Sequence, residues 1–171
     1  MVVTIMYKIG VLSDTHIPMK KKYIPEKLFD IFKNVDLIMH AGDVCQLKVI
    51  QELEQLVPVV AVAGNMDAGD ILLRYKKNLI KEIEGKRFLL IHGHQGESTA
   101  LDYVQKRSEG FDCVVFGHSH QPYNQKYNDT YLFNPGSPVD YRRPNVKKKE
   151  PSVGLLKIKN DEIVGEVIYL S

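Results

Sequence analysis

Residues 9–16 read Ile9-Gly10-Val11-Leu12-Ser13-Asp14-Thr15-His16, and this segment gives the strongest indication of the fold. An apolar run rich in β-branched residues predicts a buried strand. This run leads within two residues into Asp14 and His16, and both side chains are common metal ligands. The chain therefore begins with a strand that delivers metal-type ligands at its carboxyl end.

Four further apolar runs, at residues 37–39, 59–62, 88–91 and 113–116, also lead into polar side chains of this kind. The loops that follow them are Gly42-Asp43, Gly64-Asn65-Met66-Asp67, His92-Gly93-His94 and His118-Ser119-His120. Five of the 6 histidines lie in the clusters at 14–16, 92–94 and 118–120. Because ligands of open α/β sheets bind beyond the carboxyl ends of the strands, the pattern predicts a polynuclear metal site.

Size and composition limit the class of protein. A chain of 171 residues fits one domain, spanning 1–171, with a core of its own. The net charge of +2 is too small for the broad basic surface that nucleic-acid binding requires, so nucleic acid is not expected as a partner. No apolar run approaches the roughly 20 residues that span a bilayer, and residues 1–6 lack the pattern of a signal peptide. The two cysteines, Cys45 and Cys113, form no disulfide framework, so we expect a cytoplasmic protein that does not bind membranes.

The first half of the chain alternates strand and helix patterns. Strands are predicted at 7–12, 35–40 and 59–63. A helix that begins at Pro25 separates the first two strands, and a second helix follows the strand at 35–40. Their apolar stripes are Leu28, Ile31, Phe32 and Val35 in the first helix and Val49, Ile50, Leu53, Leu56 and Val57 in the second. This order predicts a parallel sheet with crossover helices.

The second half is rich in hairpins. Strands at 79–83 and 86–91 flank the turn pair Glu84-Gly85, and two more hairpins pair 123–127 with 131–133 and 153–158 with 163–169. A helix capped by Ser98 and running to about Glu109 precedes a strand at 112–116. We therefore predict an α/β fold in which two mixed β-sheets pack as a sandwich with helices on the outer faces. Segments 17–23, 68–77 and 140–151 are predicted loops that would control specificity, with 141–151 as a mobile one.

The donor types restrict the ion. Residues i and i+2 of an extended chain face the same way, so we expect each of three pairs to aim two donors into one space: Asp14 and His16, His92 and His94, and His118 and His120. Imidazole and carboxylate donors together suit manganese, iron, cobalt, nickel or zinc better than magnesium or calcium. Glycines in the same loops, including Gly42 and Gly64, would let the backbone approach a crowded centre.

The ordered motifs D-x-H, G-D, G-N-x-D, H-G-H and G-H-S-H resemble those of the calcineurin-like metallophosphoesterase family, in its small single-domain prokaryotic phosphodiesterase branch. The likeness runs from Ile9 to the turn Asn134-Pro135-Gly136-Ser137 and the final hairpin. It implies two divalent metal ions, of which manganese is our first choice. Asp14, His16, Asp43 and His120 would hold one ion; Asp43, Asn65, His92 and His118 would hold the other, with Asp43 as the bridge.

The resemblance implies hydrolysis of a small phosphate ester by a metal-bridging hydroxide. Two divalent ions, two aspartates and one hydroxide leave a net charge of about +1, which favours a monoanionic phosphodiester. Many family members carry a proton-donating histidine where this chain has Met66. A thioether cannot deliver a proton, so we expect a preference for good leaving groups, or a substitute catalytic acid in His94 or Asp67.

Other interpretations stay open. A phosphomonoesterase is the near alternative. A non-catalytic metal-binding scaffold is the distant one, because the same fold serves that purpose in a subunit of the eukaryotic retromer coat. Met66 favours the scaffold, and the complete set of histidines and aspartates favours the enzyme. A nuclease is less favoured because the chain has no added capping domain and no basic stripe. Hairpin edges leave room for a homodimer or homotetramer.

Single residues also have plain structural interpretations. His94 packs behind the ligands or touches phosphate, and Asp67 closes a turn or orients Asn65. His40 lies inside a strand and is expected to be structural, and Cys45 is expected to be a small buried thiol. The lysines at 20–22 either steer an anionic substrate toward the site or lie in a solvated loop, and the loop is the plainer interpretation.

Overall fold

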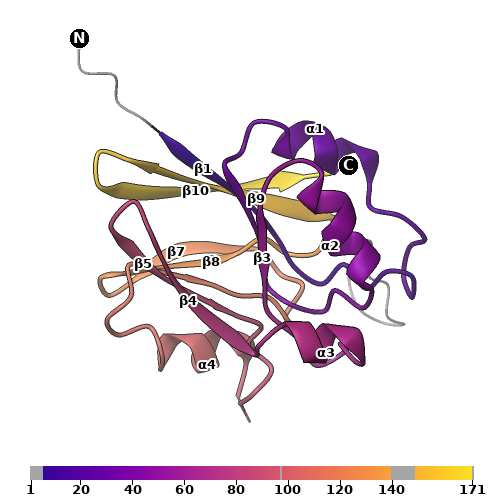
Figure 1. Ribbon diagram of the computed structural model, residues 1–171. Coiled ribbons are helices and arrows are strands. Elements are labelled where there is room, and N and C mark those ends of the chain that lie inside the picture. Colours follow the sequence, from indigo (N-terminus) through magenta and orange to yellow (C-terminus); the bar gives the residue numbers. More distant parts are fainter. Residues whose placement is uncertain (1–5, 97, 140–148, 171) are drawn as a thin grey trace.

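The computed structural model describes residues 6–96, 98–139 and 149–170. Its strands form two five-stranded mixed sheets that pack against each other (Figure 1). The first sheet has the order β10-β9-β1-β2-β3. Its strands are β1 (Tyr7–Leu12), β2 (Leu37–His40), β3 (Val59–Ala61), β9 (Ser152–Lys159) and β10 (Glu162–Tyr169). Strands β1, β2 and β3 are parallel, and the hairpin of β9 and β10 joins β1 in antiparallel fashion.

The second sheet has the order β4-β5-β6-β8-β7. Its strands are β4 (Asn78–Ile83), β5 (Lys86–Ile91), β6 (Cys113–Val115), β7 (Tyr123–Tyr127) and β8 (Thr130–Asn134). Strands β5, β6 and β8 are parallel, while β4 and β7 are antiparallel edge strands. The carboxyl ends of three parallel strands in the first sheet and of β5 and β6 in the second are therefore available to build one site.

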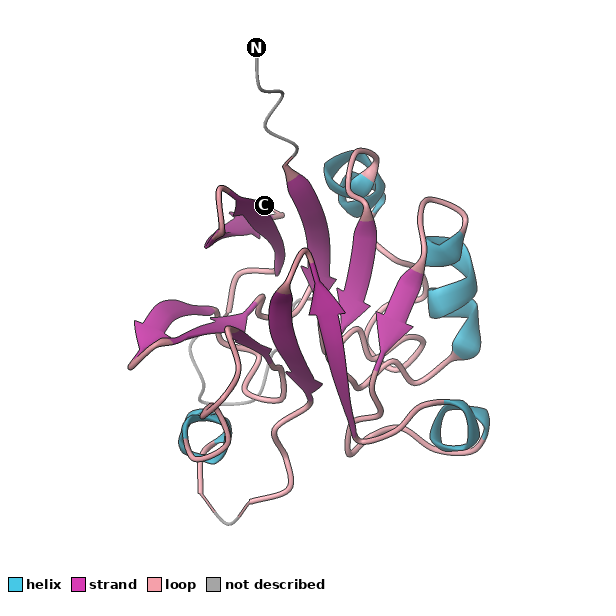
Figure 2. Ribbon diagram, turned by 60° about the vertical axis from the view of Figure 1, so that its left-hand side comes forward, coloured by secondary structure: helices cyan, strands magenta, loops and turns pink. Residues whose placement is uncertain are grey.

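Helices cover the outer faces of the sandwich (Figure 2). Helices α1 (Glu26–Phe32) and α2 (Leu47–Glu54) pack on the first sheet, where Leu28, Phe32, Ile50 and Leu53 form one apolar cluster with strand residues such as Ile38. Helix α4 (Ala100–Gln105) packs on the second sheet. The predicted α/β sandwich, with two mixed sheets inside and helices outside, is confirmed.

The alternation along β1 shows why this sequence suits an inner strand. Ile9 and Val11 point into the core between the sheets, where they meet Phe88 and Phe133. Leu12 belongs to the cluster beneath α1 and α2 instead. All three side chains are fully buried. Strand β1 is therefore covered on both faces, as strands of parallel sheets usually are.

Gly10 interrupts the apolar run for a packing reason. A Cβ atom at this position would lie 2.9 Å from Cδ1 of Phe32, which is fully buried. The lack of a side chain at Gly10 therefore lets Phe32 of α1 pack directly on the sheet.

Three sequence predictions need correction. Helix α4 is capped by Thr99 and not Ser98: Thr99 Oγ1 accepts from the N–H of Asp102 at 3.2 Å, and Asp102 accepts from the N–H of Thr99 at 3.3 Å. The helix ends at Gln105 and not near Glu109, because the N–H groups of Arg107 and Ser108 donate to carbonyls three residues back instead of four. The predicted loop 68–77 contains the short helix α3 (Asp70–Arg74).

Two further predictions concern a mobile loop and membrane-spanning helices. Most of the predicted mobile loop 141–151 lies outside the described residues. Among the helices that the described ranges contain, none has the length and apolar character needed to cross a bilayer.

Candidate metal centre

The loops that follow five parallel strands meet at one end of the sandwich. Within the first sheet, Asp14 N–H donates to Gly42 O at 2.9 Å, which ties the loop after β1 to the loop after β2. Between the sheets, His118 N–H donates to Asp14 Oδ2 at 3.0 Å. The predicted residues are thus brought together by hydrogen bonds that join both sheets.

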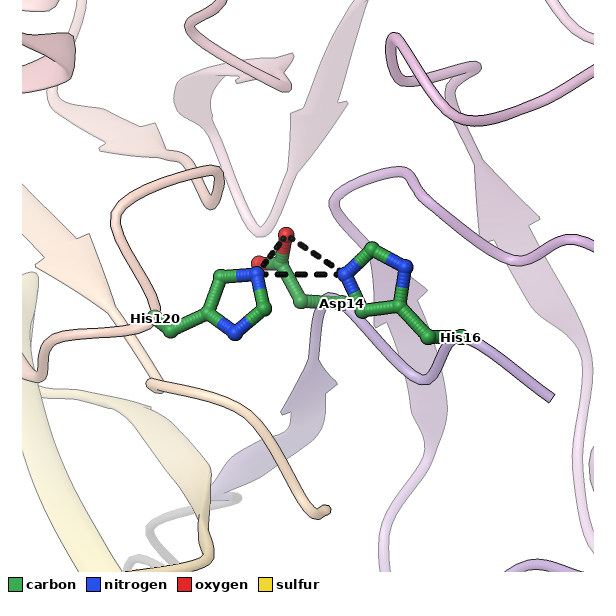
Figure 3. Close-up of side chains that lie close together, drawn as sticks. All are labelled: Asp14, His16 and His120. Carbon is green, nitrogen blue, oxygen red and sulfur yellow. Dashed lines mark hydrogen bonds and ion pairs between the residues drawn. The ribbon is translucent and has the colours of Figure 1, made fainter. Parts of the chain in front are cut away.

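A first group of donors comprises Asp14, His16 and His120, whose ligand atoms all lie within 4.8 Å of one another. Figure 3 shows the two imidazoles facing each other beside the Asp14 carboxylate. His120 Nε2 lies 3.2 Å from Asp14 Oδ1 and 3.1 Å from His16 Nε2. His16 Nε2 lies 3.8 Å from the same carboxylate oxygen.

A second group comprises Asp14, Asp43 and His92. His92 Nε2 lies 3.4 Å from Asp43 Oδ2, 3.9 Å from Asp14 Oδ1 and 3.1 Å from Asn65 Oδ1. Asp43 Oδ2 is also 3.6 Å from His16 Nε2 of the first group. Both carboxylates therefore lie between the two sets of imidazoles, and the distances alone leave either as a bridge.

The other two predicted histidines occupy different positions. The His118 ring centroid is 5.2 Å from that of His92, and His118 lines a pocket that opens onto the centre. His94 packs against His92 at 5.3 Å but is not among the residues that line this pocket. Burial, together with the nearby His92 and His118, lowers the pKa of His94. Its contacts agree with a place behind the ligands.

Each aspartate has one oxygen held by the backbone and one that faces the centre. Asp14 Oδ2 accepts from His118 N–H, and Asp43 Oδ1 accepts from Met66 N–H at 2.8 Å. Asp14 Oδ1 is buried and has no hydrogen bond. A buried carboxylate oxygen without a hydrogen bond is costly, and a cation among the imidazoles would satisfy it.

A backbone contact fixes the ring of His92. Its Nδ1 lies 2.7 Å from the carbonyl oxygen of Ala41, so Nδ1 carries the proton and Nε2 points into the centre. Burial opposes the charged form, but the carboxylates of Asp43 and Asp14 outweigh it and raise the pKa of His92 to about 9. Asp14 shows the converse: burial opposes its charge, yet His120 and His92 lower its pKa to about 2.

His40 is held by hydrogen bonds on both ring nitrogens and is fully buried. Gly42 N–H donates to Nδ1 at 3.2 Å, so the proton is on Nε2, which lies 3.1 Å from Thr15 Oγ1. Burial lowers the pKa of His40 to about 3. These contacts support the structural interpretation of His40.

Asp67 ties two loops together. Its Oδ2 accepts from the N–H of Asp43 at 2.9 Å and of Gly64 at 2.7 Å, and its Oδ1 accepts from Cys45 N–H at 2.7 Å. Burial raises the pKa of the Asp67 carboxyl against the effect of these donors. Asp67 does not line the pocket. This geometry favours a role in positioning Asp43 over the predicted role of catalytic acid.

The backbone of these loops differs from the extended chain assumed above. Asp14, His16, Asp43, His118 and His120 all have positive φ values, between 47° and 66°. Left-handed backbone is uncommon for residues with a side chain and gathers at functional sites. The extended geometry expected for these loops was therefore wrong, although Asp14 lies close to His16, and His118 and His120 line one pocket. The third expected pair does not form there, because His94 is not among the residues that line this pocket.

Glycines provide the close approach that was predicted. A Cβ atom on Gly42, whose φ is 95°, would lie 2.7 Å from His92 Nδ1. A Cβ atom on Gly64 would overlap the Asp43 carboxylate. Neither position has room for any side chain, so both loops come as close to the ligands as backbone can.

Several residues at the centre were missed. Ser137 Oγ donates to Asp14 O at 2.8 Å, and Asn134 Nδ2 donates to Gly117 O at 2.9 Å, so the turn at 134–137 supports two ligand loops. Cys45 was considered but expected to be buried; its thiol is half-buried and lies 3.9 Å from His16 Nδ1. One indication of these roles is present in the sequence, which is that the turn at 134–137 directly follows strand β8. The contacts themselves are long-range and leave no local pattern in the sequence.

The pocket that opens onto the centre has a volume of about 280 Å³. It is lined by the predicted ligands His16, Asp43, Asn65, His118 and His120 and by three further residues, Met19, Lys20 and Met66. Lys20 is exposed, as expected for a solvated loop, and it also lines this pocket together with Met19, for which no role was predicted.

Comparisons with known proteins agree with this geometry. The family model described as the calcineurin-like phosphoesterase superfamily domain matches residues 7–161. A probable metallophosphoesterase of Methanothermobacter thermautotrophicus is 40% identical, with 94% of this chain and 91% of the relative covered. A phosphodiesterase of Methanocaldococcus jannaschii is 30% identical, with 91% and 95% covered.

A solved structure supports the fold. The structure of Vacuolar Protein Sorting 29 from Cryptosporidium parvum superposes with a TM-score of 0.78 at 18% identity, covering 97% of this chain and 98% of that one. At this identity the likeness extends to the fold alone.

Proposed function

Since this chain belongs to the calcineurin-like phosphoesterase superfamily, we propose that it is a hydrolase that cleaves small phosphodiesters with two divalent transition-metal ions. The support for the diester is the relative at 30% identity that is named a phosphodiesterase. Two aspartates offset only half the charge of two divalent ions, so an anionic ester is attracted to the centre.

One observation carries the proposal: nitrogen and oxygen ligand atoms converge in two adjoining groups around a buried carboxylate oxygen that has no hydrogen bond. In the metal-free protein the raised pKa of His92 keeps a proton on Nε2, 3.1 Å from Asn65 Oδ1, and a metal ion would replace that proton between the two atoms. His16 Nε2 and His120 Nε2 meet at the same distance beside Asp14 Oδ1, which has no hydrogen bond. Such a set of nitrogen and oxygen donors fits borderline transition-metal ions.

The roles of the residues follow the two groups. In the proposal, Asp14, His16, Asp43 and His120 hold one ion, Asp43, Asn65, His92 and His118 hold the other, and Asp43 bridges them. Asp43 Oδ2, at 3.6 Å from His16 and 3.4 Å from His92, supports that bridge. When bound, such ions supply an activated water and offset charge on the phosphate.

The remaining side chains position these donors and exclude some chemistry. The hydrogen bonds of Asp67 and Ser137 to the backbone of Asp43 and Asp14 hold the ligands before substrate arrives. No serine or cysteine nucleophile is needed, and burial raises the pKa of the Cys45 thiol to about 12, so this thiol stays protonated. Met66 at the pocket has no proton to give the leaving group.

The proposal also covers the identity of the metal, the cellular compartment and the assembly of the protein. Manganese is the first choice among manganese, nickel, cobalt, iron and zinc. The protein works in the cytoplasm, in keeping with its two unpaired thiols. It acts as one domain over 1–171, and the edge strands β10 and β4 offer surfaces for a homodimer or homotetramer.

The test is hydrolysis of bis(4-nitrophenyl) phosphate beside 4-nitrophenyl phosphate. Metal-stripped protein receives each divalent ion in turn, and Asp43→Asn serves as the control variant. We expect metal-dependent turnover that the variant loses, with the diester cleaved faster than the monoester. A faster monoester would replace the proposal by phosphomonoesterase activity. Protein that binds metal and turns over neither ester would refute the enzyme and leave the scaffold, which the fold likeness at 18% identity does not favour by itself.

A further inference from the structure

The rim of the metal-centre pocket contains three residues that bind no metal in the proposed function. Met19, Lys20 and Met66 line the same pocket as His16, Asn65 and the other ligands. Met19 is 53% exposed and Met66 is 48% exposed. Apolar side chains on a surface are unremarkable singly, but two on the rim of one small pocket that is otherwise lined by proposed metal ligands and a lysine require an explanation.

Both sides of this rim are fixed to the ligands. Lys20 N–H donates to His16 O at 2.9 Å, which closes a turn directly after the ligand. Met66 follows Asn65, and its N–H donates to Asp43 Oδ1 at 2.8 Å. The backbones of Lys20 and Met66 are therefore held at set positions relative to the centre, and Met19 directly precedes Lys20.

The side-chain chemistry of the rim selects a type of ligand. A thioether is polarizable and makes favourable contacts with the edges and faces of aromatic rings. A lysine ammonium attracts a phosphate as a point charge. The volume of about 280 Å³ is at the lower end of the range for ligand pockets, which suits a phosphate with one ring better than a larger group.

We propose that Met19, Lys20 and Met66 form the subsite for the organic group of the substrate, and that this subsite selects phosphate esters that carry a planar apolar ring over those with a small alkyl group. The two methionines contact the ring, and Lys20 attracts the phosphate. The inference rests on the proposed function, because it needs the phosphate to bind at the metal centre.

The experiment measures binding, so it is independent of turnover. Phenylphosphonate and methylphosphonate are titrated into the manganese-loaded protein by isothermal titration calorimetry. Each probe has one organic group, so the ratio of their affinities reports on the subsite. We expect phenylphosphonate to bind about tenfold more tightly, as burial of one ring face predicts.

The test variant is the double substitution Met19→Ala and Met66→Ala. Since both side chains are about half exposed, their truncation leaves no cavity in the core, and a thermal melt checks that the variant folds. The affinity ratio is expected to fall to about one, with the affinity for methylphosphonate unchanged. A ratio near one in the native protein, or a ratio that the double variant leaves intact, overturns the subsite.

Lys20→Gln tests the charge separately. This variant is expected to lower the affinity for both phosphonates by the same factor, roughly threefold, without changing the ratio of the two affinities. The matched control is Lys21→Gln, because Lys21 is exposed on the same loop and does not line the pocket. Equal effects of the two variants refute the role of Lys20. Failure of methylphosphonate to bind the metal-loaded native protein contradicts the proposed function instead.

Discussion

The Nε2 atoms of His16 and His120 lie 3.1 Å apart, although the two residues are 104 positions apart in the chain. Their rings stack with centroids 5.0 Å apart and an interplanar angle of 25°. The contact is a hydrogen bond when one Nε2 carries a proton, and it is repulsive when neither or both do. A metal ion that accepts the lone pairs of both rings beside the buried carboxylate removes this dependence on a single shared proton.

Divalent metal should therefore stabilise the fold. An ion present at 100 times its dissociation constant adds about 2.7 kcal/mol, which raises the Tm of a domain of this size by roughly 5–10 °C. We expect this shift when manganese is added to chelator-treated protein, as measured by differential scanning calorimetry.

His120→Ala is the control for the thermal shift. Because His120 closes the first group of donors, this variant should lose at least half of the shift, and magnesium should produce little shift in either protein. Identical Tm values with and without manganese would contradict the predicted centre.

Asp67 is predicted to act through the backbone of its neighbours. Asp67→Ala removes the acceptor of three N–H groups, those of Asp43, Gly64 and Cys45. We expect a loss of about 3 kcal/mol in the free energy of unfolding, because buried donors are left without partners. Urea denaturation of the metal-free protein measures this loss.

Two further variants sharpen the Asp67 result. Asp67→Asn retains one carbonyl acceptor and should lose less stability than Asp67→Ala. Asp129→Asn changes an exposed aspartate in the turn between β7 and β8, and it should remain within about 0.5 kcal/mol of the native protein. If Asp67→Ala abolishes activity while leaving stability and manganese affinity unchanged, the positioning role is wrong and the catalytic role returns.

His40 should make the metal-free protein less stable in acid. Burial lowers the pKa of His40 to about 3, so the unfolded chain binds a proton that the native protein does not. The stability from neutral His40 is therefore complete above about pH 6.5 and is lost as the pH falls toward 3, at about 1.4 kcal/mol per pH unit. His92, with its pKa raised to about 9, acts at the other end: its contribution is lost as the pH rises toward that value.

The contribution of His40 is measured as a difference in slope. His40→Asn keeps an acceptor for Gly42 N–H but cannot titrate, so its free energy of unfolding should fall less steeply between pH 6.5 and 4.5. In the native protein, the imidazole nitrogen resonances of His40 should show one fixed tautomer, protonated on Nε2, throughout this range. Titration of this ring near pH 6.5 would exclude the effect.

The fold could be predicted because its elements obey local rules. The apolar run ending at Leu12 is buried on both faces, and the hairpin at Glu84-Gly85 forms where the turn pair indicates. The cap of α4 is Thr99 and not the predicted Ser98. Both hydroxyl residues suit a cap, and the reciprocal bonds between Thr99 and Asp102, three residues later, decide between them.

The candidate site was predictable as a set of residues and not as a geometry. The order of strands and ligands predicts that Asp14, Asp43 and His92 lie close together, because the carboxyl ends of parallel strands meet at one edge of a sheet. The left-handed backbone at Asp14 and His118 was not foreseeable, because it depends on hydrogen bonds between loops from different sheets. The role of Ser137 depends on a contact across 123 positions, which no local pattern encodes.

Met66→His should restore a proton donor at the pocket. Met66 follows Asn65 and lines the pocket beside the ligands, so an imidazole there reaches the space that the leaving group occupies in the proposed function. General acid catalysis contributes roughly 100-fold or more where the leaving group is poor. We therefore expect kcat to rise by about this factor on an alkyl phosphodiester and by much less on bis(4-nitrophenyl) phosphate, whose leaving group needs little protonation.

Met66→Gln separates the proton from the shape of the side chain. Glutamine is close to methionine in size and has no proton to give at neutral pH, so it should leave the rate on the alkyl ester low. The rate of Met66→His should also fall as the pH rises, because the new imidazole loses its proton. The pH–rate profile of the native protein should lack this decrease. An equal gain from both variants would trace the effect to pocket shape. No gain from either would mean that the leaving group departs on the side of the centre away from residue 66.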